Sequence, residues 1–367
     1  MTFSLSEQQR IPTSGARAAK AFNVQGLDLL AIPQLAVDVA GKPAGMNDGD
    51  SDTEVLLYRL AGDRYEPFGS LIGPGGEDAE FFQIDGRSFL AIACIRTGSG
   101  PYDFDTDSLI YEWREGAFEL FQKFPSFAAK QWKHWQVAGR HFLGLAQGLE
   151  LPGAGHNRNS LVLEWDGASF VPFQTIPSHW SYNWYPFEID GRLYVAHADH
   201  VGASVLYRWA NDRLEPHQEL IASGGRAFVH FERDGDVYLL AAAITEPPRL
   251  LRWDGTVFVS VQELAGTGAR ELTLIESAGR LLIIRVNFIT GSPAAPEPSL
   301  WSQIYEWRDG ALDVLTEFPT VGGTDSEILR VDGAVVTFAV SNGLSADVRF
   351  AGESVIYRLE LLEAGAA

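Results

Sequence analysis

Three histidines and one arginine occupy positions at which equivalent segments of this 367-residue chain carry apolar side chains. They are His134, His197, His230 and Arg285. A polar group at a position built for an aliphatic one costs roughly 2 kcal/mol or more unless it finds a partner, and such exceptions concentrate at functional sites. A histidine can act as a general acid or base, and an arginine can hold a carboxylate or an oxyanion. The opposing interpretation is structural, with hydrogen-bonded core histidines and an arginine paired with a neighbouring acid.

Aromatic side chains gather in the same part of the sequence. Two tryptophan-rich and tyrosine-rich segments, 131–136 and 178–185, precede alternating runs of strand type. Aromatic walls with a few polar groups are typical of a pocket for an organic ligand, and they are equally typical of packing between sheets. The candidate ligand-binding residues are Trp132, Trp180, Tyr182, Trp184, Asp199 and Asn287.

Two acidic segments, 47–54 and 102–107, carry aspartate at every second position, as calcium-binding loops do. The EF-hand pattern fails, because Thr53 stands where its glycine is required and Arg59 where its bidentate glutamate belongs. Solvated acidic loops and a weak Ca²⁺ site shared by two neighbouring loops both remain open. The chain contains none of the G-x-S-x-G, H-E-x-x-H or G-x-x-x-x-G-K-[ST] catalytic signatures.

The overall charge narrows the range of partners. Lys and Arg number 28 against 48 Asp and Glu, a net charge of −20. Such a surface repels a phosphate backbone and anionic lipid, so we expect neither nucleic acid nor a membrane as a partner. Cys94 is the single cysteine, which excludes an internal disulfide and a multi-cysteine metal site. With no secretion signal at the N-terminus and no apolar stretch of about 18 residues, a cytoplasmic location is expected.

The elements that must position these residues belong to an internal repeat. One short sequence motif, seen as SLIYEW at 108–113, SVLYRW at 204–209 and SQIYEW at 302–307, occurs in seven copies that are 44 to 54 residues apart. That period is typical of a four-stranded propeller blade. Each unit also pairs two alternating runs across a glycine turn, as in 80–93 and 185–198. The hairpin glycines are Gly26, Gly86, Gly139, Gly191, Gly235, Gly279 and Gly333.

Counting from these glycines identifies the four exceptions. Six residues after the glycine the chain carries apolar residues except at His197 and Arg285, and one residue before the aromatic of the first strand it does so except at His134 and His230. Two-residue turns would place both sets on the same face of the sheet. The last unit lacks its fourth strand, and residues 2–12 match it, so we expect one closed domain over residues 1–367.

The repeat unit resembles the epilepsy-associated repeat, also called the EPTP repeat. The resemblance rests on Y-x-W, F-x-x-F-Q-x-I-P and G-R-x-Y-L-A-x-A patterns in successive units. It implies an all-β fold, a seven-bladed β-propeller of four-stranded blades, and relatives that are extracellular protein-binding modules. It also implies a Ca²⁺ ion in the central channel of some relatives, at positions where this chain retains three acids, Asp78, Glu271 and Asp325. Because a signal peptide, cysteine pairs and sequons are all missing here, the receptor-binding role is not carried over.

Two functions fit this sequence. The first is a binding module whose unequal loops form an asymmetric site, at the loop face or channel mouth, for a small organic ligand or a protein partner. The second is a cofactor-independent lyase, cyclase, isomerase or hydrolase with a His, Arg and aromatic pocket over units three to six. Fold alone does not separate them, because a propeller supports both.

Overall fold

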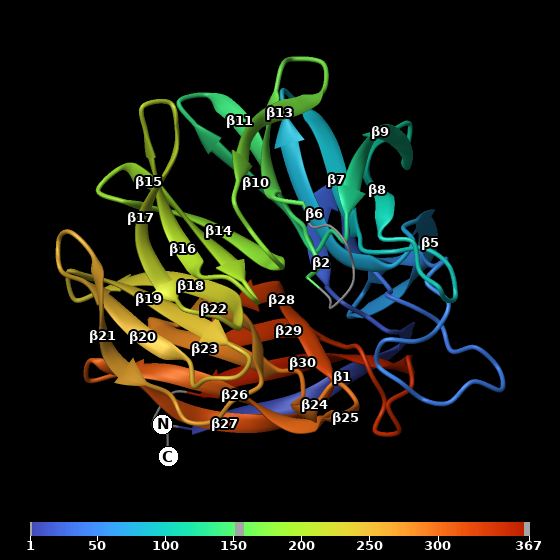
Figure 1. Cartoon of the computed structure of the whole chain (residues 1–367). Helices are drawn as coiled ribbons and strands as arrows, with labels where there is room; N and C mark the ends of the chain where they lie inside the picture. The colour runs from blue at the N-terminus through green and yellow to red at the C-terminus, as the bar shows by residue number, and fades with distance from the viewer. Residues whose placement is uncertain (1, 151–157, 363–367) are drawn as a thin grey trace.

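Alternating apolar and polar residues fold this chain into antiparallel sheets. The computed structural model describes residues 2–150 and 158–362. In these residues seven four-stranded sheets surround a central channel, and the only other sheet is a two-stranded ribbon (Figure 1). The predicted seven-bladed β-propeller is confirmed. Over the same residues, no helix has the length and apolar character needed to cross a membrane.

Each blade runs outward from its innermost strand in chain order. Blade 1 contains β2 (Lys20–Val24), β3 (Leu27–Ile32), β4 (Glu54–Ala61) and β5 (Arg64–Ile72). Blade 2 contains β6 (Gly76–Ile84), β7 (Arg87–Cys94), β8 (Asp105–Arg114) and β9 (Ala117–Phe127). Blade 3 contains β10 (Gln131–Val137), β11 (Arg140–Ala146), β12 (Ser160–Trp165) and β13 (Phe170–Ile176). Blades 4 and 5 contain β14 (Ser181–Ile189), β15 (Arg192–Asp199), β16 (Ser204–Ala210) and β17 (Arg213–Ile221); and β18 (Gly225–Arg233), β19 (Asp236–Ala243), β20 (Arg249–Trp253) and β21 (Phe258–Glu263).

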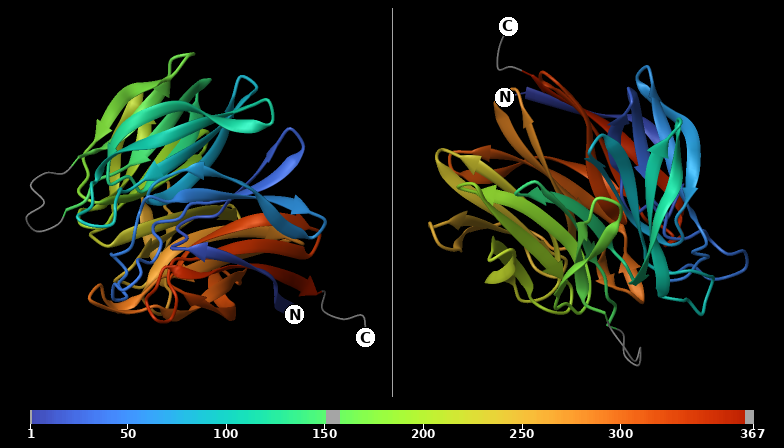
Figure 2. Two further views of the ribbon diagram at one scale, coloured as in Figure 1. Left: turned by 90° about the vertical axis from the view of Figure 1, so that its right-hand side faces the viewer. Right: turned by 90° about the horizontal axis from the view of Figure 1, so that it is seen from above.

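The last two blades differ from this plan. Blade 6 contains β22 (Ala269–Ser277), β23 (Arg280–Asn287), β26 (Ser299–Arg308) and β27 (Ala311–Val321), and its loop carries the ribbon β24 (Thr290–Ser292) and β25 (Ala295–Glu297). Blade 7 contains β28 (Gly323–Asp332), β29 (Val335–Asn342) and β30 (Ala351–Leu362), and its outer strand is β1 (Thr2–Ser14). The N-terminal segment therefore closes the ring, as predicted, and β1 pairs with β30 along its whole length, from Thr2 opposite Leu362 to Ser14 opposite Ala351 (Figure 2).

The hairpins between the first two strands of each blade set the register. In blade 2 the turn residues Asp85 and Gly86 have φ of 50° and 77°, and Ile84 pairs with Arg87 across them. Positive φ at both central residues defines a type I′ turn, which matches the right-handed twist of the flanking strands. Because the turn has two residues, Phe81 and Ile92 fall on the same face, as the sequence comparison assumed.

The apolar faces pack between neighbouring sheets. Trp135 and Phe142 of blade 3, for instance, share one core cluster with Trp184, Val195 and Tyr207 of blade 4. The repeated aromatic of the first strand is therefore a spacer that fills the wedge between two blades.

A glutamine of the repeated phrase F-Q-x-I-P joins the outer strands of adjacent blades. Gln174 of β13 donates from Nε2 to the carbonyl of Leu214 at 2.8 Å, and the Leu214 N–H donates back to Oε1 at 2.9 Å. The outer strands are too far apart to pair directly, so one side chain satisfies both backbone groups. The same two-bond arrangement joins Gln9 to Tyr65, Gln122 to Phe170, Gln218 to Phe258 and Gln262 to Leu312.

The first prediction concerns this contact. Gln174→Ala leaves the N–H and C=O of Leu214 without their partner, and we expect it to lower the free energy of unfolding by about 1–3 kcal/mol. Urea denaturation followed by tryptophan fluorescence measures the change. The exposed Gln136 of β10 supplies the control, since Gln136→Ala should shift stability by less than about 0.5 kcal/mol. Equal effects of the two substitutions would refute the role given to the glutamine.

Candidate functional site

β-Bulges at the start of the innermost strands bring an unusual ring of side chains to the channel mouth. In β6 the pairing skips Glu77, so that Gly76 and Asp78 pair with consecutive residues of β7. A bulge breaks the strict alternation of side chains, and Glu77 and Asp78 consequently both line the channel cavity. β14, β18, β22 and β28 bulge in the same way. With the matching residues of blades 1 and 3, the ring, called the collar below, comprises Arg17, Glu77, Lys130, Tyr182, Arg226, Arg270 and Thr324.

Four cations of the collar face one carboxylate. Lys130 Nζ donates to Glu77 at 3.0 Å, and Arg270 and Arg17 approach the same carboxylate at 3.5 and 3.8 Å. Burial alone would raise the pKa of Glu77, but Lys130, Arg17 and Arg270 lower it to about 2. Glu77 therefore stays ionised and still leaves an excess of three positive charges in the collar.

Arg226, unlike the other three collar cations, forms no ion pair with a carboxylate of the described residues. Its Nη1 donates to Nδ1 of His200 at 3.0 Å and to the carbonyl of Gly225 at 2.9 Å, and its guanidinium carbon lies 3.8 Å from the centre of the Tyr182 ring. The side chain is buried, and its Nε has no hydrogen-bond acceptor among the described residues. Burial lowers the pKa of Arg226 to about 10, and that of His200 to about 4, so His200 is neutral at pH 7.

Above the collar lies a cavity of about 910 Å³, called the basin below. Its floor is the collar, and its walls come from the loops that connect blades or join the second and third strands of a blade. Among the described residues, the loop of blade 1 (residues 33–53) is long, and those of blades 4 and 5 (residues 200–203 and 244–248) are short. Tyr182, Trp180 and His200 line one side of the basin. The remaining wall residues include Leu35, Met46, Ile95, Tyr102, Phe104, Leu149, Ile244, Phe288 and Ile289.

Arg96 also borders the basin, but its contacts are structural. Its guanidinium bonds to Ser51 Oγ and to the carbonyls of Asn47 and Asp48 and stacks 3.6 Å from the centre of the Tyr102 ring. All three guanidinium nitrogens are thereby used to hold the long loop of blade 1 against blade 2.

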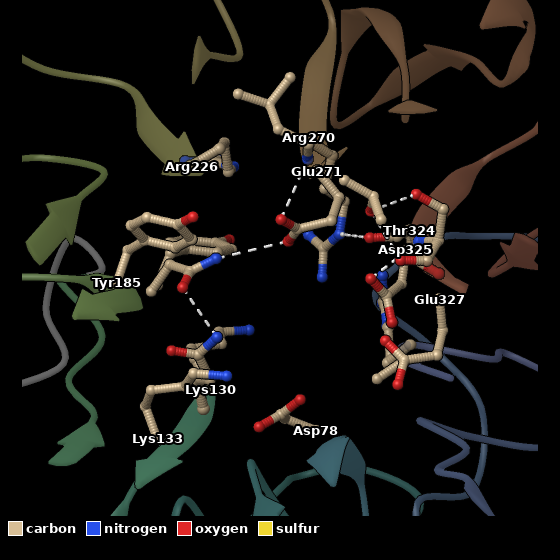
Figure 3. Close-up of a pocket in the computed structure, with 18 of the residues that line it drawn as sticks. Asp78, Lys130, Lys133, Tyr185, Arg226, Arg270, Glu271, Thr324, Asp325 and Glu327 are labelled. Atoms are coloured by element: carbon tan, nitrogen blue, oxygen red, sulfur yellow. Dashed lines mark hydrogen bonds between the residues drawn. The ribbon is translucent and has the colours of Figure 1, made fainter. Parts of the chain in front are cut away.

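Below the collar the channel is acidic, with Asp78, Glu271 and Asp325 on different sides of the opening (Figure 3). Their oxygens accept backbone N–H groups, from Trp132 to Asp78 at 3.1 Å and from Ala19 to Asp325 at 2.7 Å. Burial raises the pKa of both Asp78 and Glu271 to about 8. Because burial favours their protonated forms near pH 7, Asp78 and Glu271 supply little negative charge to balance the collar cations.

These acids do not fit a compact calcium centre. Across the part of the chain that the structure describes, no three His, Cys, Asp or Glu side chains are placed to hold one metal ion. The same holds for the acidic loops 47–54 and 102–107, where Asp50 and Asp103 accept the N–H of the residue two positions later. Asp78 and Asp325 each link two adjacent blades, and Glu271 accepts hydrogen bonds from the N–H of Leu272 and from Asn183 of blade 4.

The structure separates the four residues that break the apolar pattern. His134 stacks on Phe82 of blade 2 and bonds to His141 at 3.0 Å, and His230 stacks on Phe187 of blade 4. His197 is buried and bonds to Ser181 Oγ at 2.6 Å. Each lies in a different space between blades or within a sheet. None of them lines the basin or the described channel cavity.

Arg285 is fully enclosed in blade 6. It donates to the carbonyls of Ala265, Gly266 and Thr267 at 2.6, 3.0 and 3.0 Å, and its Nε donates to Asn287 at 2.9 Å. These acceptors explain how a guanidinium with 1% exposure is tolerated without a carboxylate. Arg285 thereby fixes the loop that leads from blade 5 to blade 6.

Only two of the six candidate ligand-binding residues reach the basin, namely Trp180 and Tyr182. Trp132 and Trp184 are fully buried in the cores between blades. Asp199 supports the site indirectly, because its carboxylate accepts the N–H groups of His179 and Trp180 and so holds the start of β14. Asn287 bonds to Arg285 and to the carbonyl of Trp301.

The collar cations were missed by the sequence analysis, although a signal for them exists. The internal comparison that selects Asp78, Glu271 and Asp325 yields, one residue earlier in each repeat, three arginines and a lysine. Cations at four of seven equivalent positions stand out in a chain of net charge −20. In an ideal strand consecutive side chains point to opposite faces, so the residue before each channel acid would be expected to point away from the channel.

Comparison with known proteins identifies related sequences. The EPTP domain family matches residues 169–210 and 213–254, which span the outer strand of blade 3, all four strands of blade 4 and the first three strands of blade 5. The thrombospondin-type laminin G domain and EAR repeat-containing proteins of Homo sapiens and Mus musculus are 26% and 28% identical over 168 residues. That stretch is 45% of this chain and 23% of each relative, so it covers less than a quarter of their length.

The second prediction separates a structural from a functional Arg285. Arg285→Met leaves three backbone carbonyls without a donor, and we expect the free energy of unfolding to fall by about 3 kcal/mol or more. Chemical denaturation measures this loss. A variant as stable as the wild type would show that Arg285 has no structural role.

The third prediction concerns pH. Burial lowers the pKa of His134 to about 4 in the folded state, whereas an unfolded histidine titrates near 6.5. As pH falls from about 6.5 to 4, the unfolded chain takes up a proton that the folded chain refuses, so stability is lost in that window. His134→Leu, which copies Leu274 of blade 6, should raise the melting temperature relative to wild type by roughly 1–3 °C more at pH 5 than at pH 7.5. Parallel melting curves across this pH range would contradict it.

Proposed function

Since the chain belongs to the EAR/EPTP family of seven-bladed propellers, we propose that it is a binding module whose basin at the channel mouth receives a small organic anion. The observation that carries this proposal is the collar, in which Arg17, Lys130, Arg226 and Arg270 face the single carboxylate of Glu77. Buried cations are stable when they are paired. An anionic ligand would supply the missing charge.

The setting of the collar supports this proposal. The protein carries a net charge of −20, so its surface as a whole repels anions. An anion can therefore bind only where positive side chains are concentrated, as they are in the collar. Arg17, Lys130 and Arg226 are only 7%, 9% and 5% exposed. Their guanidinium and ammonium groups form hydrogen bonds that are stronger in a recessed site than in water.

The depth of the collar favours a small molecule over a folded protein partner. A flat protein surface cannot reach side chains that lie beneath the loops, whereas a ligand of ordinary metabolite size fits a cavity of about 910 Å³. The enzymatic alternative that uses His134, His197, His230 and Arg285 draws no support from their placement, because these side chains do not share a cavity.

The fourth prediction tests the proposal. Benzoate, succinate and inorganic phosphate are compared with the neutral benzamide and succinamide by isothermal titration calorimetry. We expect at least one anion to bind and its neutral counterpart not to bind. Arg226→Gln should raise the dissociation constant for that anion at least tenfold, because it removes the buried charge while retaining a hydrogen-bonding side chain.

The control is Arg252→Gln, since Arg252 is exposed on β20 and paired with Asp236. It changes the net charge by the same amount outside the basin and should leave the dissociation constant unchanged. Equal affinity for benzoate and benzamide, or an unchanged constant in Arg226→Gln, would overturn the proposal.

A further inference from the structure

The basin has two chemically distinct parts. Its floor is the charged collar, and its walls are mainly apolar. Three wall residues, Leu35, Ile95 and Phe288, are buried members of one hydrophobic cluster, and Phe104, Ile244 and Ile289 pack against it while remaining partly exposed. These residues come from the loops of blades 1, 2, 5 and 6, so the apolar wall surrounds the opening rather than forming a single stripe.

Phe288 marks the boundary between the two parts. The guanidinium carbons of Arg17 and Arg270 lie 5.6 and 5.1 Å from the centre of its ring. The guanidinium carbon of Arg226 likewise lies 3.8 Å from the centre of the Tyr182 ring. Cations held against aromatic faces stay close to apolar surface without losing their charge. A ligand lying on Phe288 or Tyr182 would therefore contact apolar carbon and a guanidinium together.

A ligand that contacted only the collar or only the apolar walls would leave the other part of the basin without a suitable partner. A small hydrophilic anion such as phosphate would use the floor and leave the apolar walls facing water. A neutral apolar molecule would fill the walls and leave the excess charge of the collar unpaired. Each apolar group that leaves water for the walls adds affinity in proportion to its area. A ligand with both features gains from both parts.

Resting on the proposed function, we infer that the basin takes an amphipathic organic anion, with its charged head on Arg226 and the neighbouring collar cations and its apolar body between the loop walls. The head reaches side chains that are less than a tenth exposed, so it must be narrow, as a carboxylate is. The body occupies a space of about 910 Å³, which is large enough for a fused aromatic ring system or an alkyl chain.

The experiment uses four probes that separate head from body. Naphthalene-2-carboxylate carries both, acetate carries the head alone, naphthalene-2-carboxamide carries the body without charge, and a tetraglutamate peptide represents an acidic protein segment. Calorimetric titration of the full chain should give a dissociation constant for the naphthoate at least tenfold lower than for each of the other three.

Variants of the two parts sharpen the assignment. Phe104→Ala and Ile244→Ala shorten partly exposed walls and should each weaken naphthoate binding about threefold to tenfold without changing acetate binding. Arg226→Gln should weaken both carboxylates. Phe68→Ala, on the outer strand β5 and 37% exposed, is the matched aromatic control and should change neither. Circular dichroism and melting temperature establish that each variant is folded before its binding is compared.

The contrary results are distinct. If acetate binds as tightly as the naphthoate, the inference about the body fails and the proposed anion site stands. If the carboxamide binds as tightly as the naphthoate, or if no probe binds, the proposed anion site fails as well. If tetraglutamate binds best, the occupant is an acidic peptide rather than an amphipathic small molecule.

Discussion

The innermost strands of a propeller cannot pair with one another, and the rest of this structure depends on how their free backbone groups are satisfied. Each innermost strand, β2, β6, β10, β14, β18, β22 or β28, is the end strand of its own sheet, so the N–H groups on its channel edge have no partner strand. A buried N–H without a partner costs about 1–3 kcal/mol. Here side chains of the adjacent blade supply the acceptors: Asp78 serves Trp132, Glu80 serves His134, and Gln131 serves Trp184.

This constraint explains why the channel is polar and acidic. It also distinguishes the residues that link the blades from the collar residues that form the candidate site. The acids and amides below the collar are occupied in joining one blade to the next. The glutamines of the outer strands, such as Gln174, do the same at the rim. The collar cations have a different origin: Arg226 and Arg270 are the extra residues of bulges in β18 and β22, and Arg17 and Lys130 precede β2 and β10. Of these four, Arg270 also links to the next blade, through the carbonyl of Thr324. Arg226 illustrates the difference, since it reaches loop carbonyls and His200 but leaves its Nε unpaired among the described residues.

Because the blades are linked at both their innermost and their outer strands, the ring tolerates connecting loops of unequal length. The segment 33–53, which is 21 residues long, separates the second and third strands in blade 1, whereas only the short segment 200–203 separates them in blade 4. The loops of blades 1, 2, 5 and 6 rise over the collar and form the apolar wall, while the short loop of blade 4 presents His200 directly to Arg226. Asymmetry at the mouth therefore arises without any change in the blades beneath it.

The sequence by itself determined the number of blades, the hairpins, the closure by the N-terminal strand and the loop face, because each follows from local alternation, turn residues and a repeat that can be compared with itself. It also identified Trp180 and Tyr182. It could not rank His134, His197, His230 and Arg285, since whether a polar residue opens to solvent or meets a carbonyl from a distant loop depends on contacts between blades. Only the tertiary structure decided that Arg285 closes onto Ala265, Gly266 and Thr267, and that Arg17, Lys130, Arg226 and Arg270 converge. The physical reason is that four residues spread over some 250 positions come together only when the ring closes. Two of them, Arg226 and Arg270, are also turned toward the mouth by bulges that break the alternation of an ideal strand.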